Sequence, residues 1–273
     1  MKGRKAVSNW IDMEQWYTVL PPSRPTNNEL NRIKNYLSNI DQNCYIGVLG
    51  STPEFRELLY RLGFKNRIIF DKSVDFYLRM SKLSPSNVMD GEMLVVGDWV
   101  QTLKEWKNKF SVILSDLTMG NVPYCCRSAF YHNIAEALDN EGVFIDKVLA
   151  FDFAIPTIAD LFDKYEQLPI NLRTINDFSS EVLFCSDLVK KEDIVDSTAF
   201  YDIIKQGDFS QKIKFFADAA HMITPEGFIW YYGKSWDELR IDYEKHFSTQ
   251  TIYAEDDETS PYYMRTKQIF SIK

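Results

Sequence analysis

Three aspartates each follow a short apolar run, and their carboxylates are the side chains best placed to do chemistry. They are Asp71, Asp98 and Asp116. Carboxylates accept hydrogen bonds from hydroxyl groups and favour a cationic ligand nearby. Because the carboxyl ends of parallel strands meet at one edge of a sheet, where ligands bind, we expect the three side chains to share a site. A single aspartate after an apolar run occurs often by chance, so the prediction depends on the order and spacing of all three along the chain.

Residues 44–55 supply a fourth component of this site, which is a tight turn between a strand and a helix. The apolar run ends at Gly50, where the backbone can turn without a Cβ clash. We expect Thr52 to cap the following helix and Pro53 to occupy its first turn. The free N–H groups and positive dipole end of that helix would suit a small anionic group. The same pattern is typical of any β–α unit.

The elements that position these residues alternate between strands and helices. Continuous apolar runs that alternate with helical patterns predict a parallel sheet covered on both faces, and therefore a doubly wound α/β fold. The predicted strands are residues 44–50, 67–71, 92–98, 110–116 and 142–149, with a helix over 125–139 before the last of them.

The C-terminal part of the chain predicts a helix followed by antiparallel strands rather than further parallel strands. Ser235 and Glu238 form a capping box, which predicts a helix that runs to about residue 246. Two β-rich runs follow at 250–254 and 265–272, and they predict an antiparallel hairpin at the far edge of the sheet. The sheet is therefore expected to have seven strands and to be mostly parallel.

The N-terminal segment, residues 1–40, is expected to be helical with a break at the prolines of 21–25. Thr26 and Glu29 form a capping box for its last helix. Two interpretations remain open for this segment, a packing helix against the sheet or a lid over the ligand site.

Residues 151–234 interrupt the alternation and are rich in aromatic side chains. Short helical patterns predict a helical insertion, with helices over 158–168, 193–204 and 212–222. The core domain then consists of 41–150 together with 235–273. The insertion is interpreted as a cap that shapes an apolar substrate pocket, and the alternatives are ordinary core packing and a dimer interface.

Composition limits the classes of function. The chain has 273 residues, of which 45% are hydrophobic and 26% charged, as in soluble globular proteins. Its formal net charge of −8 argues against non-specific binding to nucleic acid, and no apolar run is long enough to span a membrane. No secretory signal is recognisable, and the four cysteines lack paired metal-ligand spacing. We expect a cytoplasmic protein with reduced thiols and no metal site.

The order of these motifs resembles that of class I S-adenosylmethionine-dependent methyltransferases, whose fold is Rossmann-like. The resemblance covers residues 44–150 and 235–273. Most members of that family carry Gly-x-Gly-x-Gly at the first turn, whereas this chain has Leu49-Gly50-Ser51-Thr52-Pro53-Glu54. A Leu-Gly-x-Thr-Pro-Glu run is similar to a variant in some bacterial methyltransferase-like proteins. The missing glycines argue against a dinucleotide pyrophosphate and leave a nucleoside–amino-acid ligand acceptable.

The resemblance implies a role for each residue of the predicted site. The turn Gly50-Ser51-Thr52 would pass under the methionine moiety of S-adenosylmethionine. Asp71 would accept hydrogen bonds from the ribose hydroxyls, and its alternative role is to cap the next helix. Asp98 and Trp99 would bind and stack the adenine, and the alternative for Trp99 is core packing.

The resemblance also places Asp116 and the loop after it beside the methionine end of the cofactor and the substrate. The substrate-side candidates in that loop are Thr118, Asn121 and Tyr124. Methyl transfer from a sulfonium is an in-line displacement, which needs alignment more than it needs a catalytic triad. A general base is required only where the acceptor must lose a proton early.

The leading hypothesis is a methyltransferase that acts on a small molecule or a short peptide, with a homodimer as a further expectation. The second hypothesis is a non-catalytic binding or scaffold protein that keeps the fold, and the altered first turn favours it. The third is another enzyme that uses the same cofactor, such as an aminopropyl transferase. The methyl acceptor is left open by the sequence.

Overall fold

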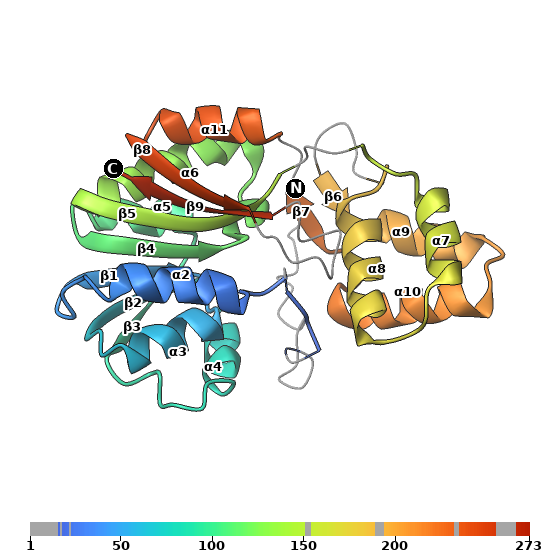
Figure 1. Ribbon diagram of the computed structural model, residues 1–273, viewed down its shortest axis with the longest axis horizontal. Coiled ribbons are helices and arrows are strands. Elements are labelled where there is room, and N and C mark those ends of the chain that lie inside the picture. The colour runs from blue at the N-terminus through green and yellow to red at the C-terminus, as the bar shows by residue number, and fades with distance from the viewer. Residues whose placement is uncertain are drawn as a thin grey trace.

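The computed structural model describes residue 16 and residues 18–21, 23–150, 154–188, 194–231, 235–254 and 266–273. Its centre is a seven-stranded sheet with the strand order β3-β2-β1-β4-β5-β9-β8 (Figure 1). Strands β1 to β5 pair in parallel, and β9 pairs antiparallel with both β5 and β8. The strands are β1 (Tyr45–Leu49), β2 (Asn66–Asp71), β3 (Glu92–Val96), β4 (Phe110–Asp116), β5 (Leu138–Leu149), β8 (Thr249–Ala254) and β9 (Thr266–Ile272). The predicted doubly wound, mostly parallel sheet with a C-terminal antiparallel pair is confirmed.

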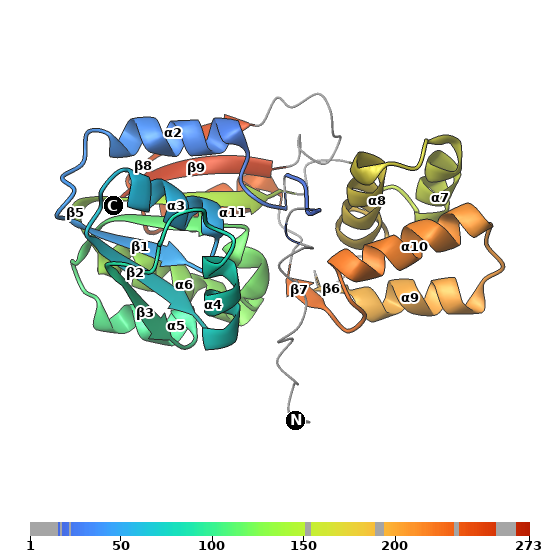
Figure 2. The ribbon, with the colours of Figure 1, turned by 90° about the horizontal axis from the view of Figure 1, so that it is seen from below.

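Helices cover both faces of this sheet, as Figure 2 shows. One face carries α2 (Asn27–Leu37), α3 (Pro53–Arg61) and α4 (Val74–Ser81), whose apolar side chains form one core with β1, β2 and β4. The other face carries α5 (Trp99–Thr102), η1 (Leu103–Glu105), α6 (Tyr124–Ala137) and α11 (Trp236–Glu244), which enclose a second core. The short helix η2 (Thr118–Asn121) follows β4. The inner strands β1, β2 and β4 are buried on both faces because apolar residues occupy nearly every position, as expected for parallel strands, whereas the edge strand β3 is partly exposed.

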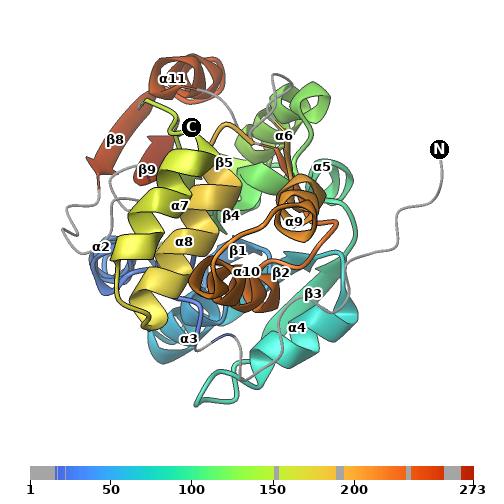
Figure 3. The same ribbon diagram turned by 90° about the vertical axis from the view of Figure 1, so that its right-hand side faces the viewer.

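Residues 154–231 form a separate group of helices beside the carboxyl ends of the parallel strands (Figures 1 and 3). These helices are α7 (Ile158–Gln167), α8 (Leu172–Phe184), α9 (Ser197–Gln206) and α10 (Gln211–Ile223). Their shared core is aromatic, with the Phe178 ring 5.0 Å from Tyr165 and 5.1 Å from Phe216. Most of the aromatic residues that distinguish this segment in the sequence therefore hold the insertion together.

The insertion differs from the prediction in one respect, because it also contains a two-stranded antiparallel sheet of β6 (Ile194–Asp196) and β7 (Ile229–Tyr231). The helix predicted over 193–204 begins only at Ser197. Asp196 ends β6 and accepts a hydrogen bond from the Thr198 amide, which makes it the N-cap of α9.

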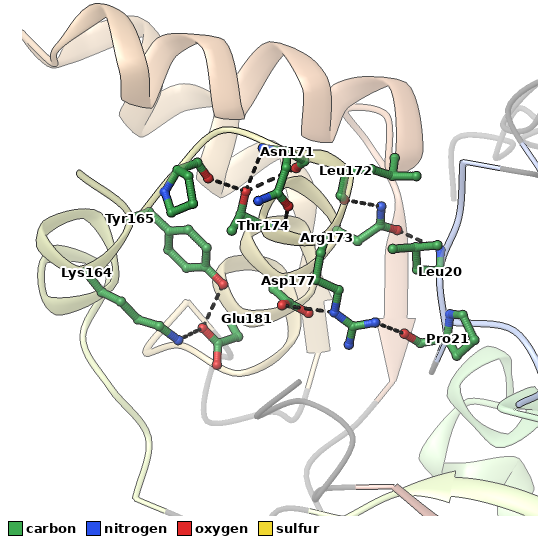
Figure 4. A network of polar contacts seen from close by, with 12 residues as sticks. Leu20, Pro21, Lys164, Tyr165, Asn171, Leu172, Arg173, Thr174, Asp177 and Glu181 are labelled. Atoms are coloured by element: carbon green, nitrogen blue, oxygen red, sulfur yellow. Dashed lines mark hydrogen bonds and ion pairs between the residues drawn. The ribbon is translucent and has the colours of Figure 1, made fainter. Parts of the chain in front are cut away.

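Residues 16–25 connect the insertion to the sheet. Asn176 of α8 accepts a hydrogen bond from the Leu20 amide at 2.8 Å and donates to the Thr18 carbonyl at 2.9 Å. Arg173 of α8 donates to the Pro21 carbonyl, and Figure 4 shows this contact. On the sheet side, the Trp16 indole donates to Glu54 at 3.2 Å. Most of the first helix that was predicted before the prolines lies outside the described residues, and residues 18–20, which it was expected to include, are not helical.

One strand boundary and one helix cap also depart from the sequence predictions. Strand β5 begins at Leu138 rather than residue 142, because Leu138 pairs with Phe110 before the register shifts. Thr52 stands at the N-cap of α3 without a side-chain hydrogen bond to the described residues, and Pro53 does occupy the first turn. The capping boxes at Thr26–Glu29 and Ser235–Glu238 are both present as predicted. The turn predicted between β8 and β9 lies outside the described residues.

Candidate functional site

The carbonyl oxygen of Phe70 is the point where the first three predicted site segments meet. It accepts a hydrogen bond from the Gly50 amide at 2.8 Å and a second from the Trp99 indole nitrogen at 2.8 Å. The next residue is Asp71, whose own carbonyl accepts from the Gly97 amide at 3.0 Å. The turn after β1, the end of β2 and the segment after β3 are therefore held together at one edge of the sheet.

Gly50 makes the turn that the sequence predicts for it. Its φ of +87° lies in the left-handed region that glycine tolerates and residues with a Cβ rarely adopt. No atom of the described residues lies within 4 Å of the position that a Cβ would take there. The turn thus presents bare backbone to open space, where a ligand can approach closely.

The Asp71 carboxylate lies at the end of β2 and is 7% exposed. Its Oδ2 accepts a hydrogen bond from the Ser51 hydroxyl at 2.5 Å, and its Oδ1 accepts from the Ser73 amide at 2.9 Å. Burial raises the pKa of Asp71, and the bonds from Ser51 and Ser73 offset part of that shift. The helix α4 is capped by Ser73, whose hydroxyl accepts from the Phe76 amide, so Asp71 itself is not the N-cap.

Asp98 and Trp99 differ in their surroundings. Asp98 is the N-cap of α5, accepts from the Val100 amide at 3.0 Å and forms an ion pair with Lys72 at 2.7 Å. Its side chain is 48% exposed and can reach a ligand. Trp99 is partly buried against the main core, and its indole N–H is already bonded to Phe70. One ring face of Trp99 lies near the Lys72 ammonium, 6.0 Å from the ring centre.

Asp116 is held by an ion pair that the sequence analysis did not anticipate. Its Oδ1 lies 2.6 Å from Nζ of Lys147, and both side chains are almost completely buried. Lys147 Nζ also contacts Glu29 at 3.3 Å and donates to the Arg24 carbonyl at 3.1 Å. Glu29, Lys147 and Asp116 thus form a buried salt-bridge triad. The place of Asp116 beside the methionine end of a cofactor stays a prediction.

The protonation of this triad follows from its burial. Burial raises the pKa of Glu29 and of Asp116, while the Lys147 ammonium offsets part of that effect in both carboxyls. Burial alone would lower the pKa of Lys147, but Asp116 and Glu29 together raise it above its usual value. A signal for Lys147 was available in the sequence, since a lysine inside the apolar run 142–149 is rarely buried without a partner.

The three substrate-side candidates do not lie in equivalent places. Thr118 is buried, and its hydroxyl donates to the Leu49 carbonyl at 3.4 Å. Asn121 is exposed, and Tyr124 begins α6 with its ring 3.9 Å from the guanidinium carbon of Arg127. Thr118 therefore braces the turn after β1, whereas Asn121 and Tyr124 remain accessible or partly so.

The loop that carries these candidates is covered by β7 of the insertion. A Cβ on Gly120 would lie only 0.9 Å from the indole nitrogen of Trp230, so the Trp230 ring is seated directly on this glycine. Arg127 of α6 donates to the Tyr231 carbonyl at 2.5 Å. Sequence analysis grouped Trp230 with the aromatic insertion but gave no role to Arg127.

A cavity of about 290 Å³ lies between α2 and the start of α3. Its walls include Trp16, Leu30, Pro53 and Glu54, and exclude Gly50 and Asp71. This cavity therefore lies next to the turn between β1 and α3, but it is not formed by the strand ends that carry the aspartates. We base the candidate site on the hydrogen-bonded junction at Phe70, because the predicted ligand-binding groups converge there.

Among the described residues, no helix combines the length and the apolar character needed to cross a bilayer. No protein-family model matches the chain, and no curated protein sequence is significantly similar to it. Solved structures do resemble it over nearly the whole described fold.

A structure provisionally described as a zinc-dependent alcohol dehydrogenase from Rhodobacter sphaeroides aligns with a TM-score of 0.57 at 14% identity, covering 96% of this chain and 97% of that one. One provisionally described as an S-adenosylmethionine-dependent methyltransferase from Listeria monocytogenes aligns with a TM-score of 0.51 at 13% identity, covering 90% and 95%.

A phosphoethanolamine N-methyltransferase from Haemonchus contortus, in complex with phosphomonomethylethanolamine and S-adenosylhomocysteine, aligns with a TM-score of 0.51 at 9% identity. The alignment covers 96% of this chain and 57% of that one. At these identities the similarity shows the fold alone, a Rossmann-like fold with a seven-stranded, mostly parallel sheet.

Proposed function

We propose that this protein binds S-adenosylmethionine at the carboxyl edge of β1 to β3 and transfers its methyl group to a small molecule or a short peptide. The junction at the Phe70 carbonyl carries the proposal, because it joins the Gly50 turn, Asp71 and Trp99. The fold is shared with structures that are described as methyltransferases, one of them in complex with S-adenosylhomocysteine. These likenesses support a cofactor of the same kind.

The residues at the junction fit such a cofactor. Each Asp71 oxygen accepts one protein hydrogen bond and keeps a lone pair for a ribose hydroxyl. The bare backbone at Gly50 allows a ligand to lie against the turn. When bound, the cofactor supplies an activated methyl group on a sulfonium cation. Asp71 and the exposed Asp98 contribute negative charge that favours a cation, and the rigid junction orients the ligand for in-line displacement.

The non-catalytic alternative has one specific observation in its favour. Asp116, expected beside the methionine end, is neutralised by Lys147 and buried. An aminopropyl transferase remains the third candidate, and mass spectrometry of the cofactor-derived product separates it from a methyltransferase. A cytoplasmic location and a homodimer remain further proposals.

Calorimetric titration of the full chain with S-adenosylmethionine and S-adenosylhomocysteine tests the proposed function. We expect saturable heat with both compounds, and methyl transfer from labelled cofactor into at least one fraction of a metabolite and peptide mixture. Binding without transfer would favour the scaffold alternative. No heat and no thermal shift at millimolar ligand would reject the cofactor assignment.

Replacing Asp71 with alanine is expected to weaken S-adenosylmethionine binding at least tenfold while the protein stays folded. Charge-assisted hydrogen bonds to the two ribose hydroxyls are worth about 1.5–3 kcal/mol each, so losing even one accounts for a tenfold change. Calorimetry measures the dissociation constant, and circular dichroism checks the fold. Asp75→Ala is the matched control, since Asp75 is an exposed partner of Arg79 on α4. Equal affinities for Asp71→Ala and the control would mean that Asp71 only braces Ser51 and Ser73.

We further propose that the insertion caps the acceptor site and sets substrate choice rather than cofactor affinity. Trp230 is the residue through which it meets the loop after β4. Tyr201, another aromatic residue of the insertion, is buried and donates to the Thr224 carbonyl, so it belongs to the insertion's core.

Trp230→Ala is therefore expected to lower methyl transfer at least tenfold at a fixed acceptor concentration, with cofactor affinity changed less than twofold. The reason is that the indole seated on Gly120 is lost, and the loop bearing Asn121 loses its cover. Phe215→Ala, on the exposed side of α10, is the control. Sizing chromatography accompanies the assay, because unchanged turnover with a new monomeric state would replace the cap by a dimer interface.

A further inference from the structure

Arg127 is a buried cation that has no acidic partner among the described residues. It lies in the first turn of α6 and is 2% exposed. No carboxylate of the described residues lies within ion-pair distance of it, and its Nη1 makes no hydrogen bond to them. By contrast, the equally buried Arg56 contacts Glu92 at 2.6 Å. Arginine is seldom buried without a counter-ion, because an uncompensated charge loses its hydration.

The guanidinium of Arg127 lies at the N-terminal end of α6. Its Nε donates to the Val122 carbonyl, which precedes the helix, at 3.4 Å, and its Nη2 donates to the Tyr231 carbonyl at 2.5 Å. The guanidinium carbon is 3.9 Å from the ring centre of Tyr124, the first residue of the helix. Helical side chains lean toward the N-terminus, so this position follows from the backbone direction.

The helix end itself adds a second positive feature at the same place. Pro123 occupies the N-cap and offers no side-chain acceptor to the first-turn N–H groups, and α6 has 14 residues to contribute its dipole. A buried guanidinium whose Nη1 has no hydrogen-bond partner among the described residues therefore lies at the same end of α6 as a helix N-terminus without a side-chain cap. Both features favour an anion with several acceptor oxygens.

The first turn of α6 lies near the candidate site. Asn133 of α6 donates to the Val100 carbonyl of α5 at 2.8 Å, so α6 packs beside the helix that begins at Asp98. At its N-terminal end α6 comes shortly after η2, which carries Asn121 and the Gly120 that lies under Trp230. The first turn of α6 thus lies on the acceptor side of the edge at which we place the cofactor.

We propose that Arg127 and the first turn of α6 bind an oxyanion of the methyl acceptor, either a carboxylate or a phosphate. The planar guanidinium offers Nη1 to that oxyanion while Nε and Nη2 hold it in place. Tyr124 stacks on the guanidinium and fixes its plane. The proposal rests on the proposed function, since it names the chemical class of that enzyme's substrate. Because Nη1 is buried and Nη2 is bonded to the Tyr231 carbonyl of β7, binding of the oxyanion requires β7 to move away from the first turn of α6.

The test uses benzoate and phenyl phosphate as probes, with benzyl alcohol as the neutral analogue. Each is titrated into the full chain with and without saturating S-adenosylhomocysteine, and binding is followed by ligand-observed NMR. We expect at least one anionic probe to bind tenfold more tightly than benzyl alcohol, and the stronger of the two identifies carboxylate or phosphate. Equal binding of all three probes would overturn the proposal.

Substitutions locate the bound anion. Arg127→Gln is expected to weaken the preferred anion at least tenfold, and Arg127→Lys is expected to retain part of the affinity because it keeps the charge without the fork. The matched control is Arg67→Gln, which also removes a buried guanidinium, but at the amino end of β2 on the opposite edge of the sheet. Undiminished anion binding in Arg127→Gln would place the anion elsewhere and overturn the proposal.

Two further readouts separate folding and cofactor effects from anion binding. Thermal melts identify a variant that fails to fold. If Arg127→Gln does not fold, the proposal is judged from the wild-type preference for anionic over neutral probes and from the anion affinity of Arg127→Lys. Binding of S-adenosylhomocysteine is measured independently of the probes. If the cofactor product does not bind but the anion binds through Arg127, the proposed methyltransferase fails while the oxyanion site stands.

Discussion

Replacing Lys147 with methionine is expected to lower the free energy of unfolding by about 3–5 kcal/mol, because removing one member of a buried ion pair leaves its partner uncompensated. The effect is large here because Lys147 serves two carboxylates, Asp116 at 2.6 Å and Glu29 at 3.3 Å. Methionine has a similar length and no charge, so the loss is electrostatic rather than a cavity.

The triad links three elements at the carboxyl ends of the parallel strands. Glu29 belongs to the capping box of α2, Asp116 ends β4, and Lys147 lies near the end of β5. Lys147 also donates to the Arg24 carbonyl, in the segment that reaches Asn176 of the insertion through residues 18–20. Loss of the ammonium therefore weakens the attachment of both the N-terminal segment and the insertion.

Urea unfolding at pH 8 and pH 5 measures the effect. In Lys147→Met the two carboxyls lose the cation that favours their ionised forms, so their raised pKa values rise further, and the deficit relative to wild type is expected to shrink at pH 5. Lys205→Met, which breaks a largely exposed pair with Glu226 at 2.8 Å, is the control and should cost less than about 1 kcal/mol. A Lys147→Met deficit no larger than that of the control would contradict a structural triad.

A triple variant adds an independent check. Combining Lys147→Met with Glu29→Gln and Asp116→Asn removes all three charges, so no uncompensated ion is left in the protein. We expect the triple variant to be more stable than Lys147→Met alone, since replacing a complete buried network is far less costly than breaking it. A triple variant whose loss equals the sum of its three single losses would mean that the residues act separately.

The fold could be predicted from sequence because its determinants are local and repeated. Apolar runs mark the parallel strands, and a turn with a glycine at φ +87° follows β1 as expected. The two capping boxes start helices at the predicted places. The boundary at Leu138 was missed because β5 starts before the apolar run 142–149. At Leu138, pairing with Phe110 rather than a run of apolar residues determines the strand conformation.

The candidate site could be predicted only in part, because its residues come together through contacts between distant segments. Sequence order placed Asp71 and Asp98 at strand ends, and both lie there. The partner of Asp116 is 31 positions further along and belongs to a neighbouring strand, so no local pattern connects Asp116 with Lys147. Arg127 was missed for a related reason, since only the three-dimensional structure shows that no described carboxylate pairs with it.

Asp146→Asn is expected to remove most of a pH dependence of stability that Asp146 imposes between about pH 4 and pH 7. Asp146 lies on β5, is fully buried, and accepts a hydrogen bond from the Tyr243 hydroxyl at 2.5 Å. Burial raises the pKa of Asp146 to about 7, although the hydrogen bond from Tyr243 works against that shift. The carboxyl is therefore protonated in the folded protein at pH values where it is ionised in the unfolded chain.

The direction follows from proton linkage. Between the unfolded and the folded pKa the native state holds one more proton, so the free energy of unfolding falls as pH rises, by about 1.4 kcal/mol per unit and about 4 kcal/mol in all. The stabilising contribution is fully present below the unfolded pKa and lost as pH rises through about 7. Asparagine carries no titrating proton and keeps an acceptor for Tyr243, so Asp146→Asn should gain stability relative to wild type as pH rises.

Urea unfolding of wild type and Asp146→Asn at pH 4.5, 6 and 8 measures this difference. We expect the variant to gain several kcal/mol relative to wild type between the lowest and the highest pH, by the linkage of about 1.4 kcal/mol per unit. Asp237→Asn is the control, because Asp237 is an exposed residue of α11, the helix that also carries Tyr243. Parallel pH profiles for Asp146→Asn and wild type would show that Asp146 stays ionised in the folded protein, with the Tyr243 hydroxyl compensating fully for burial.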